Sequence, residues 1–244
     1  MRLQIVVFPM RPWLLSLLPG LWLSISVVPA SAQERVYSYS VVHPYYGTIG
    51  TFTERIARSG DTTRIESHVR VAVKIFGIVV HREEGDHVEI FRSDRLISLQ
   101  SATTTNGARL EVRGEAKGEY FVVTSPTGVV EAPSDVAPSD PWVLKQIGVG
   151  TVVSVKTGRI IPTRVSGGEP AMLPLQGAMV PTRHFTARGE REQEIWLNDQ
   201  DVPVMFRSVE NGTSIDFILT SPWRDAAVAE AHLVPAAKLH PAKE

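Results

Sequence analysis

The sequence predicts a mostly β protein: an antiparallel curved sheet or half-barrel of about ten strands, with one short helix packed on its concave face. Three observations predict this class. Short runs that alternate apolar and polar residues recur along the chain. Turn residues separate them about every 8–12 positions, as in sandwiches, barrels and curved sheets, which strand faces alone do not distinguish. One segment, Asp140–Gly148, combines the start and stop signals of a helix.

Residues 1–32 predict a cleaved, Sec-type signal peptide and therefore a periplasmic protein. Two arginines and no acid accompany an apolar run from Trp13 to Val28, and Ala30-Ser31-Ala32 ends the segment. A basic opening, an apolar middle and a small-x-small end are the parts of a secretory leader. The alternative is a membrane anchor. Pro19 and Gly20 interrupt the run, and a spanning helix needs about 20 apolar residues.

The chain without its leader is nearly neutral. Of 25 basic residues Arg2 and Arg11 lie in the leader, which leaves 23 against 26 acidic ones, a net charge of −3. Nucleic acids and anionic headgroups attract a concentrated positive face, and the sequence has no basic block. We therefore expect no nucleic-acid partner and no stable membrane anchor after cleavage. Without cysteine the chain forms no disulfide, although exported proteins often use them.

The length of the mature chain predicts one β-rich domain over 33–220. Residues 221–244 are Ala-rich, with Pro235 and Pro241 near the end, and predict a weakly helical or disordered tail. Before residue 60 we expect strands over 35–42 and 48–58, separated by a break that contains Pro44.

The stretch Thr62–Asn106 is the predicted centre of the sheet. Its apolar and charged residues fall on opposite sides of a strand: Ile65, Val69, Val71, Val73 and Ile75 against Glu66, His68, Arg70 and Lys74. Successive side chains of a strand point to opposite faces, so the strand has one buried and one solvated face. Gly77 lies between two apolar runs and predicts a bulge or a tight bend.

Two Asn-Gly pairs predict hairpins, because both residues tolerate the positive φ of a type I′ turn. Asn106-Gly107 would join 95–104 to 108–115, and Asn211-Gly212 would join 203–209 to 213–219. In the second hairpin we expect apolar side chains to face each other, Val204 and Phe206 against Ile215, Phe217 and Leu219.

The rest of the chain predicts further short strands over 120–124, 151–165, 180–187 and 193–197, with turns at Thr157-Gly158, Gly167-Gly168 and Arg188-Gly189-Glu190. The Pro-rich stretch 132–140 predicts a loop. In the following helix Asp140 suits the N-cap, and Gly148 suits the left-handed stop. Two turns of helix are unstable alone, so Trp142 and Ile147 should pack on the sheet.

Four short segments resemble a known family. They are Tyr46–Thr51, Arg95–Leu99 running into Thr105–Gly107, Lys156–Arg159 and Glu194–Asp199. They are similar to the exported bacterial family catalogued as domain of unknown function 6134, and to the related domain-of-unknown-function 3108 group, over about 35–219. The resemblance implies a periplasmic β-rich protein with no established activity and no catalytic residues. Its shape is similar to the half-barrel lipoprotein carriers of the Gram-negative envelope, an analogy that does not fix function.

The densest group of metal-ligating residue types is H-R-E-E-G-D-H over 81–87. His81, Glu83 and His87 are candidate ligands for zinc or another divalent ion, because imidazole and carboxylate bind such metals. The alternative is a solvated turn at Gly85-Asp86 between two strands, and it implies no cofactor. Glu89 matches ordinary surface charge.

The sequence contains no motif of a nucleophilic serine, a phosphate loop or a dinucleotide site. One-sided strands and a single helix favour a non-enzymatic binding or carrier module for an apolar or envelope-derived ligand, such as a lipid. The candidate ligand-binding residues are Tyr45, Tyr46, Trp142, Ile147 and Trp196, unless these side chains fill the core. The alternatives are an envelope hydrolase or metal-dependent enzyme using groups near His81–His87, and a structural assembly partner.

Overall fold

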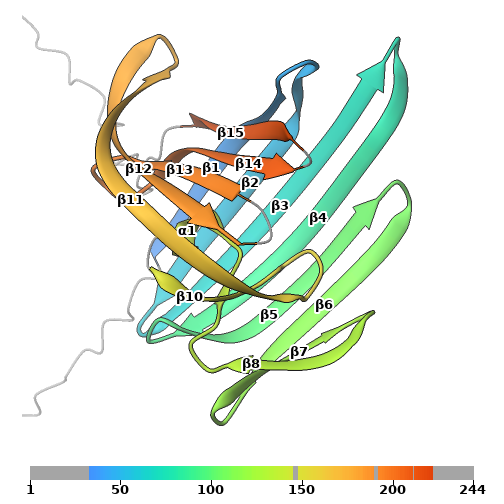
Figure 1. Ribbon diagram of the computed structural model, residues 1–244, viewed down its shortest axis with the longest axis vertical. Coiled ribbons are helices and arrows are strands. Elements are labelled where there is room, and N and C mark those ends of the chain that lie inside the picture. Colours follow the sequence, from blue (N-terminus) through green and yellow to red (C-terminus); the bar gives the residue numbers. More distant parts are fainter. Residues whose placement is uncertain (1–32, 145–147, 190–191, 211, 222–244) are drawn as a thin grey trace, which may run out of the picture. The chain divides into compact units, whose positions relative to one another are not determined.

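The computed structural model describes residues 33–144, 148–189, 192–210 and 212–221, which form a 15-stranded, strongly curved sheet (Figure 1). The first half of the sheet contains β1 (Gln33–His43), β2 (Gly47–Ser59), β3 (Thr62–Ile75), β4 (Ile78–Arg92), β5 (Arg95–Thr105), β6 (Ala108–Lys117), β7 (Tyr120–Ser125) and β8 (Gly128–Pro133). The second half contains β9 (Ala137–Pro138), β10 (Val149–Val153), β11 (Ile160–Leu175), β12 (Ala178–Arg188), β13 (Glu192–Leu197), β14 (Pro203–Glu210) and β15 (Thr213–Ser221). The helix α1 (Pro141–Leu144) lies between β9 and β10.

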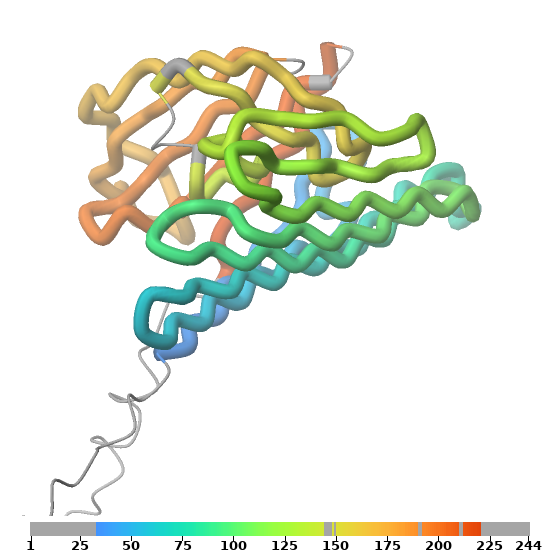
Figure 2. Tube along the Cα trace, turned by 90° about the horizontal axis from the view of Figure 1, so that it is seen from below, coloured from blue at the N-terminus to red at the C-terminus, as the bar shows by residue number. Residues whose placement is uncertain are grey.

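The strand order is β8-β7-β6-β5-β4-β3-β2-β1-β15-β14-β13-β12-β11-β10-β9, so the first and last strands are neighbours. In that junction Tyr39 lies opposite Leu219 and Val41 lies opposite Phe217. The described strand pairs are antiparallel except β9 and β10, which are parallel. The sheet curls until β9 and β10 lie near β5 and β8, and Figure 2 shows its two halves facing each other. The predicted curved, half-barrel class is therefore confirmed, with more strands than the ten expected.

Both turn chemistry and register confirm the predicted hairpins. Asn106 and Gly107 have φ of 49° and 89° between β5 and β6, as a two-residue turn with positive φ requires. In the other hairpin Phe206 lies opposite Phe217, and their rings stack at 4.4 Å. Asn211 itself lies outside the described residues.

Two predicted turns are wrong, because both lie inside long strands. Gly85 is within β4 and pairs with β3 and β5 on its two sides. Gly167 and Gly168 form a bulge in β11, where a Cβ on Gly167 would lie 2.5 Å from the carbonyl oxygen of His184. Glycine is needed there for close approach of two backbones rather than for a chain reversal. The reversal comes later, at Gln176 and Gly177.

Helix α1 lies on the concave face, as predicted. The backbone N–H of Trp142 donates to Asp140 Oδ1 at 2.7 Å, so Asp140 is the N-cap. The Trp142 ring contacts Tyr37 of β1 with ring centroids 4.3 Å apart, and Tyr37 is fully buried. Ile147, the leader and the predicted tail lie outside the described residues.

Candidate functional site

The concave interior contains a cavity of about 220 Å³ between the two halves of the sheet. Strands β2, β3 and β4 contribute one side, and β10 to β15 contribute the other. Much of its wall is apolar: Phe52, Val69, Val152, Val155, Ile161, Phe206 and Phe217. The remainder of the core packs around it. Among the described residues, the concave face is therefore covered mainly by the sheet itself and at one place by α1.

Three carboxyl groups are buried at this cavity. Glu54 of β2, Glu89 of β4 and Asp140 before α1 expose 0%, 1% and 6% of their surface. Glu89 and Asp140 line the cavity directly. Glu54 lies next to it, where Ser67 Oγ of the cavity wall donates to Glu54 Oε2 at 3.5 Å. Strand alternation places both glutamates inside, because Glu54 shares a face with Phe52 and Ile56, and Glu89 shares one with Phe91. Assigning Glu89 to ordinary surface charge was wrong.

The two glutamates are short of hydrogen-bond partners. Glu54 Oε1 and Glu89 Oε2 are buried atoms to which no described residue donates. Most buried polar atoms are hydrogen-bonded, and a buried acceptor without a donor costs free energy. Asp140 differs, because the Trp142 N–H satisfies its Oδ1. The unsatisfied Glu89 oxygen therefore marks the place in the cavity wall where a hydrogen-bond donor is missing.

Burial controls the protonation of these groups. It raises the pKa of Glu54 and of Glu89 well above the ordinary value, and the neighbouring Asp140 carboxyl adds to both shifts. Burial raises the pKa of Asp140 to about 6, opposed by the Trp142 N–H. Burial therefore favours the protonated form of both glutamates, because an unpaired buried carboxylate is costly.

Two further polar pairs lie in or beside the cavity. Lys156 Nζ is 2.6 Å from Glu83 Oε2. His87 Nδ1 is 2.7 Å from Ser101 Oγ, and burial lowers the pKa of His87 to about 4, so its ring is neutral at pH 7. His87 lines the cavity, whereas Ser101 is not part of the lining. The pair therefore does not present a serine nucleophile to a molecule in the cavity.

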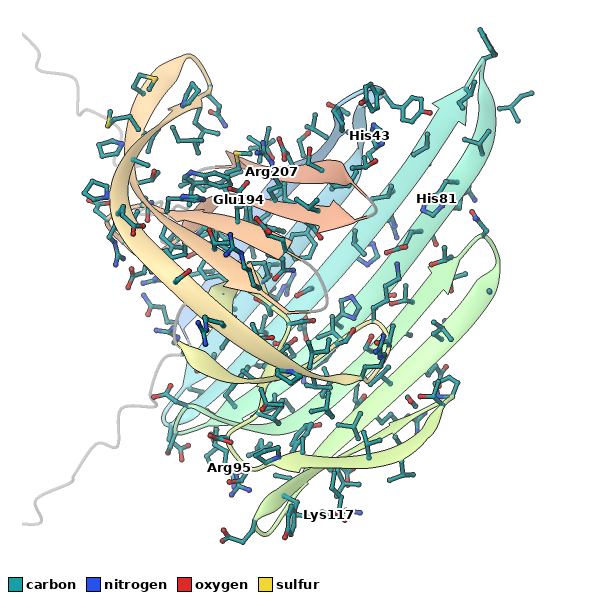
Figure 3. The ribbon with its side chains drawn as sticks, in the orientation of Figure 1. His43, His81, Arg95, Lys117, Glu194 and Arg207 are labelled. Carbon is teal, nitrogen blue, oxygen red and sulfur yellow. The ribbon has the colours of Figure 1, made fainter. Side chains whose placement is uncertain are left out.

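The structure does not bring the predicted metal ligands together. His81, Glu83 and His87 lie on the single strand β4, and the two histidines are about 20 Å apart along it at the rise of an extended strand. Figure 3 shows His81 on β4, toward the β3–β4 turn. The described part of the chain holds no group of three or more His, Cys, Asp or Glu side chains that could hold a metal ion.

The predicted aromatic ligand-binding residues are also dispersed. Tyr45 and Tyr46 lie in the β1–β2 turn and expose 83% and 47% of their surface. Trp142 packs on Tyr37 beside the cavity. Trp196 lies on the opposite face of β13 from the buried Ile195 and Leu197. None of these four lines the cavity, and Ile147 lies outside the described residues.

A charged group surrounds Trp196 on that opposite face. Arg207 donates to Asp216 through two nitrogens, at 2.6 and 3.0 Å, and also to Glu194 at 3.3 Å. The His184 ring stacks on Trp196 with centroids 4.6 Å apart. Figure 3 shows Arg207 and Glu194 side by side on adjacent strands. These cross-strand pairs satisfy each other, as expected of a structural network.

Comparison with known proteins supports the fold. A solved structure titled a beta-barrel-like protein of domain of unknown function DUF1849, from Brucella abortus, superposes with a TM-score of 0.61. It is 9% identical, and the match covers 78% of this chain and 96% of that one, so it shows the fold alone. No curated protein matches the sequence. No helix among the described residues is long and apolar enough to cross a membrane.

A match to a family profile identifies the family. The profile described as "Domain of unknown function (DUF6134)" matches residues 47–220, well over half of the chain. The matched range begins at β2 and runs through most of β15, so it includes every strand that lines the cavity. The chain therefore belongs to the DUF6134 family.

Proposed function

We propose that the protein is a non-enzymatic binding or carrier module of the periplasm, which holds a small envelope-derived ligand in its interior cavity. The leader pattern of residues 1–32 supports the location. The observation that carries the binding role is Glu89 Oε2, a buried acceptor in the cavity wall with no donor among the described residues.

The chemistry of the cavity favours an amphipathic ligand. Phe52, Phe206 and Phe217 provide an apolar surface, while Glu89 and Asp140 provide acceptors that would bind an ammonium or another group rich in N–H donors. Ligand pockets usually measure about 300–1,000 Å³. A cavity of about 220 Å³ therefore suits a small molecule or one end of a longer one.

A hydrolase has weaker support. His87 is neutral and lines the cavity, but its hydroxyl partner Ser101 is not in the lining. Of the three carboxyls that line it, Glu83 is paired with Lys156. Glu89 and Asp140 sit among apolar residues in a space that a bound ligand would fill. A purely structural assembly role does not explain why a donor-deficient cavity is kept in the core.

The test uses three probes of equal chain length: hexylamine, hexanol and hexanoate. We expect hexylamine to raise the melting temperature of the protein, and hexanoate to have no effect. The variant E89Q should weaken hexylamine binding by roughly tenfold to a hundredfold, because one partner of a buried charge contact is lost. Binding should also release protons, which calorimetry in buffers of different ionisation enthalpy measures.

The matched control is E84Q, which changes an exposed glutamate on the same strand and should bind hexylamine as the wild type does. Equal binding of the three probes, or hexylamine binding that survives E89Q, would refute the role of the carboxyls. Failure of every probe, together with a ligand-free mass for protein recovered from the periplasm, would count against the carrier itself.

A further inference from the structure

The β3–β4 hairpin projects beyond its neighbours (Figure 1). Pairing of β3 with β2 ends at Val71, and pairing of β4 with β5 ends at Glu83. Beyond that point, the Asn106 N–H donates to the Arg82 carbonyl, and the Arg82 N–H donates to Asn106 Oδ1. From Val71 to the turn at Phe76 the hairpin extends about 17 Å at the rise of a strand. Its end is therefore a two-stranded ribbon, a form that is only marginally stable alone in water.

The end of this hairpin, residues 75–80, is here called the apolar tip. Its large apolar side chains are all exposed: Ile75 38%, Phe76 101%, Ile78 68%, Val79 41% and Val80 50%. Single exposed apolar residues are common on protein surfaces, but a contiguous group of them marks an interaction site. The tip is the densest such group among the described residues, since the other exposed ones occur singly or in pairs.

The conformation of the turn is unfavourable for Phe76, so this residue does not stabilise the fold. Phe76 and Gly77 have φ of 50° and 81°, close to the 49° and 89° of Asn106 and Gly107. A two-residue hairpin with both φ positive favours Asn-Gly, whereas a bulky residue in this region is strained. Phe76 also has no buried contact to offset that strain, because it is fully exposed. A strained residue kept at an exposed turn points to a role outside the fold.

The charges beside the tip are of one sign. From Ala72 to Arg82, the part of the hairpin beyond its pairing with β2 and β5, the chain carries Lys74 and Arg82 and no Asp or Glu. Both are exposed. They lie opposite the uncharged Val79 and Ala72, and the nearest acids, Glu83 and Glu84, lie at the base of this part, opposite Val71 and Arg70. An apolar end with basic side chains just behind it matches the interface of an anionic bilayer.

We propose that the apolar tip docks on an anionic lipid bilayer, with Phe76 and Ile78 at the level of the headgroups. Lys74 and Arg82 would extend their charged ends to lipid phosphates, while their alkyl parts lie along the apolar surface. One small tip gives reversible, peripheral binding rather than a stable anchor. The inference is independent of what the cavity holds, because none of the residues of the tip lines it.

The test is cosedimentation of the full chain with vesicles of phosphatidylethanolamine and phosphatidylglycerol, compared with phosphatidylcholine alone. We expect binding to the anionic vesicles that falls as salt is added. The variant F76N should reduce the partition coefficient by roughly tenfold to a hundredfold, because the apolar ring no longer leaves water. K74Q and R82Q should each reduce it by about fivefold.

F76N also keeps the test independent of folding. Asn suits the left-handed turn, so its melting temperature should equal or exceed that of the wild type. The matched control is V129S, which removes an exposed apolar side chain (65%) from the edge strand β8 and should leave binding unchanged. Comparison within the same full chain cancels any contribution of residues outside the described range.

Three results would overturn the proposal. They are equal vesicle binding by wild type and F76N, equal binding to neutral and anionic vesicles, and self-association that F76N removes in the absence of any vesicle binding. The last result would assign the tip to a second copy of this chain instead.

Discussion

Lys156 Nζ lies 2.6 Å from Glu83 Oε2, so an ion pair joins the loop after β10 to β4 across the cavity. These strands are not neighbours in the sheet. Thr105 Oγ1 donates to the same Glu83 oxygen at 3.2 Å. The pair therefore fixes the distance between the two halves of the sheet at a place where no strand pairing does.

Removing the cation of this pair should destabilise the fold. We expect K156M to lower the free energy of unfolding by about 1–2 kcal/mol, between the values of exposed and buried pairs, since both side chains are part-buried. Urea denaturation measures it. In a double-mutant cycle the E83Q/K156M chain should lose less than the two single changes added together; simple additivity would show that the two residues do not interact.

The buried carboxyls predict a stability that falls as pH rises. The pKa of Asp140 is raised to about 6 in the folded chain, so between about pH 4 and pH 6 the folded state binds more protons than the unfolded one. D140N keeps an N-cap acceptor and removes the charge. We expect it to be more stable than the wild type at pH 8 by roughly 1–3 kcal/mol, with the difference shrinking toward pH 4.

Chemical denaturation at a series of pH values measures this difference. D135N is the matched control, because Asp135 is exposed in the turn between β8 and β9, close to Asp140 in sequence, and it should follow the wild-type profile. If the unfolding free energy of D140N ran parallel to that of the wild type at every pH, ionisation of Asp140 would not destabilise the fold, and the prediction would be wrong.

His87 predicts the opposite slope. Burial lowers its pKa to about 4, so from about pH 6.5 down to pH 4 the unfolded chain binds more protons and stability is lost. H87N should remove this loss, which we expect to be about 1–3 kcal/mol. Its profile should therefore diverge from the wild type only below about pH 6.5. H43N, at the end of β1 and outside the cavity, should leave the profile unaltered. Equal acid sensitivity of H87N and wild type would contradict the prediction.

The stacked rings of Phe206 and Phe217 should dominate the packing of the second half. Phe206 is 7% exposed and also contacts Tyr39 at 5.3 Å. We expect F206A to cost about 3–5 kcal/mol of unfolding free energy, measured in urea, because it leaves a cavity. F76A makes the same change at a fully exposed position and should stay within about 0.5 kcal/mol of the wild type. If F206A cost less than about 3 kcal/mol, the surrounding core would have collapsed into the space that the ring leaves.

Local sequence patterns predicted the features that depend on residues close together in the chain, namely strand faces and turns. The alternation after Thr62 and the Asn106-Gly107 turn lie where expected, because strand faces and turn chemistry are set within a few residues. Glycine was ambiguous: the same freedom that serves a turn at Gly107 serves a bulge at Gly167, and only the partner backbone at His184 distinguishes them.

The candidate site was harder to predict, because it depends on contacts between distant segments. Glu54 lies two residues from both Phe52 and Ile56, so its position on the buried face could have been read from alternation alone. Its neighbours Glu89 and Asp140 come from separate parts of the chain, and no local pattern indicates that the three carboxyls meet. The basic residues beside the apolar tip were likewise diluted in a nearly neutral total charge.

The junction of β1 with β15 has a consequence for biogenesis. Strand β1 must wait for β15, the last of the described strands, before its second edge is hydrogen-bonded. Such sequence-distant closure makes assembly slow and leaves an open edge meanwhile. The polypeptide therefore needs protection from aggregation until β15 has been delivered.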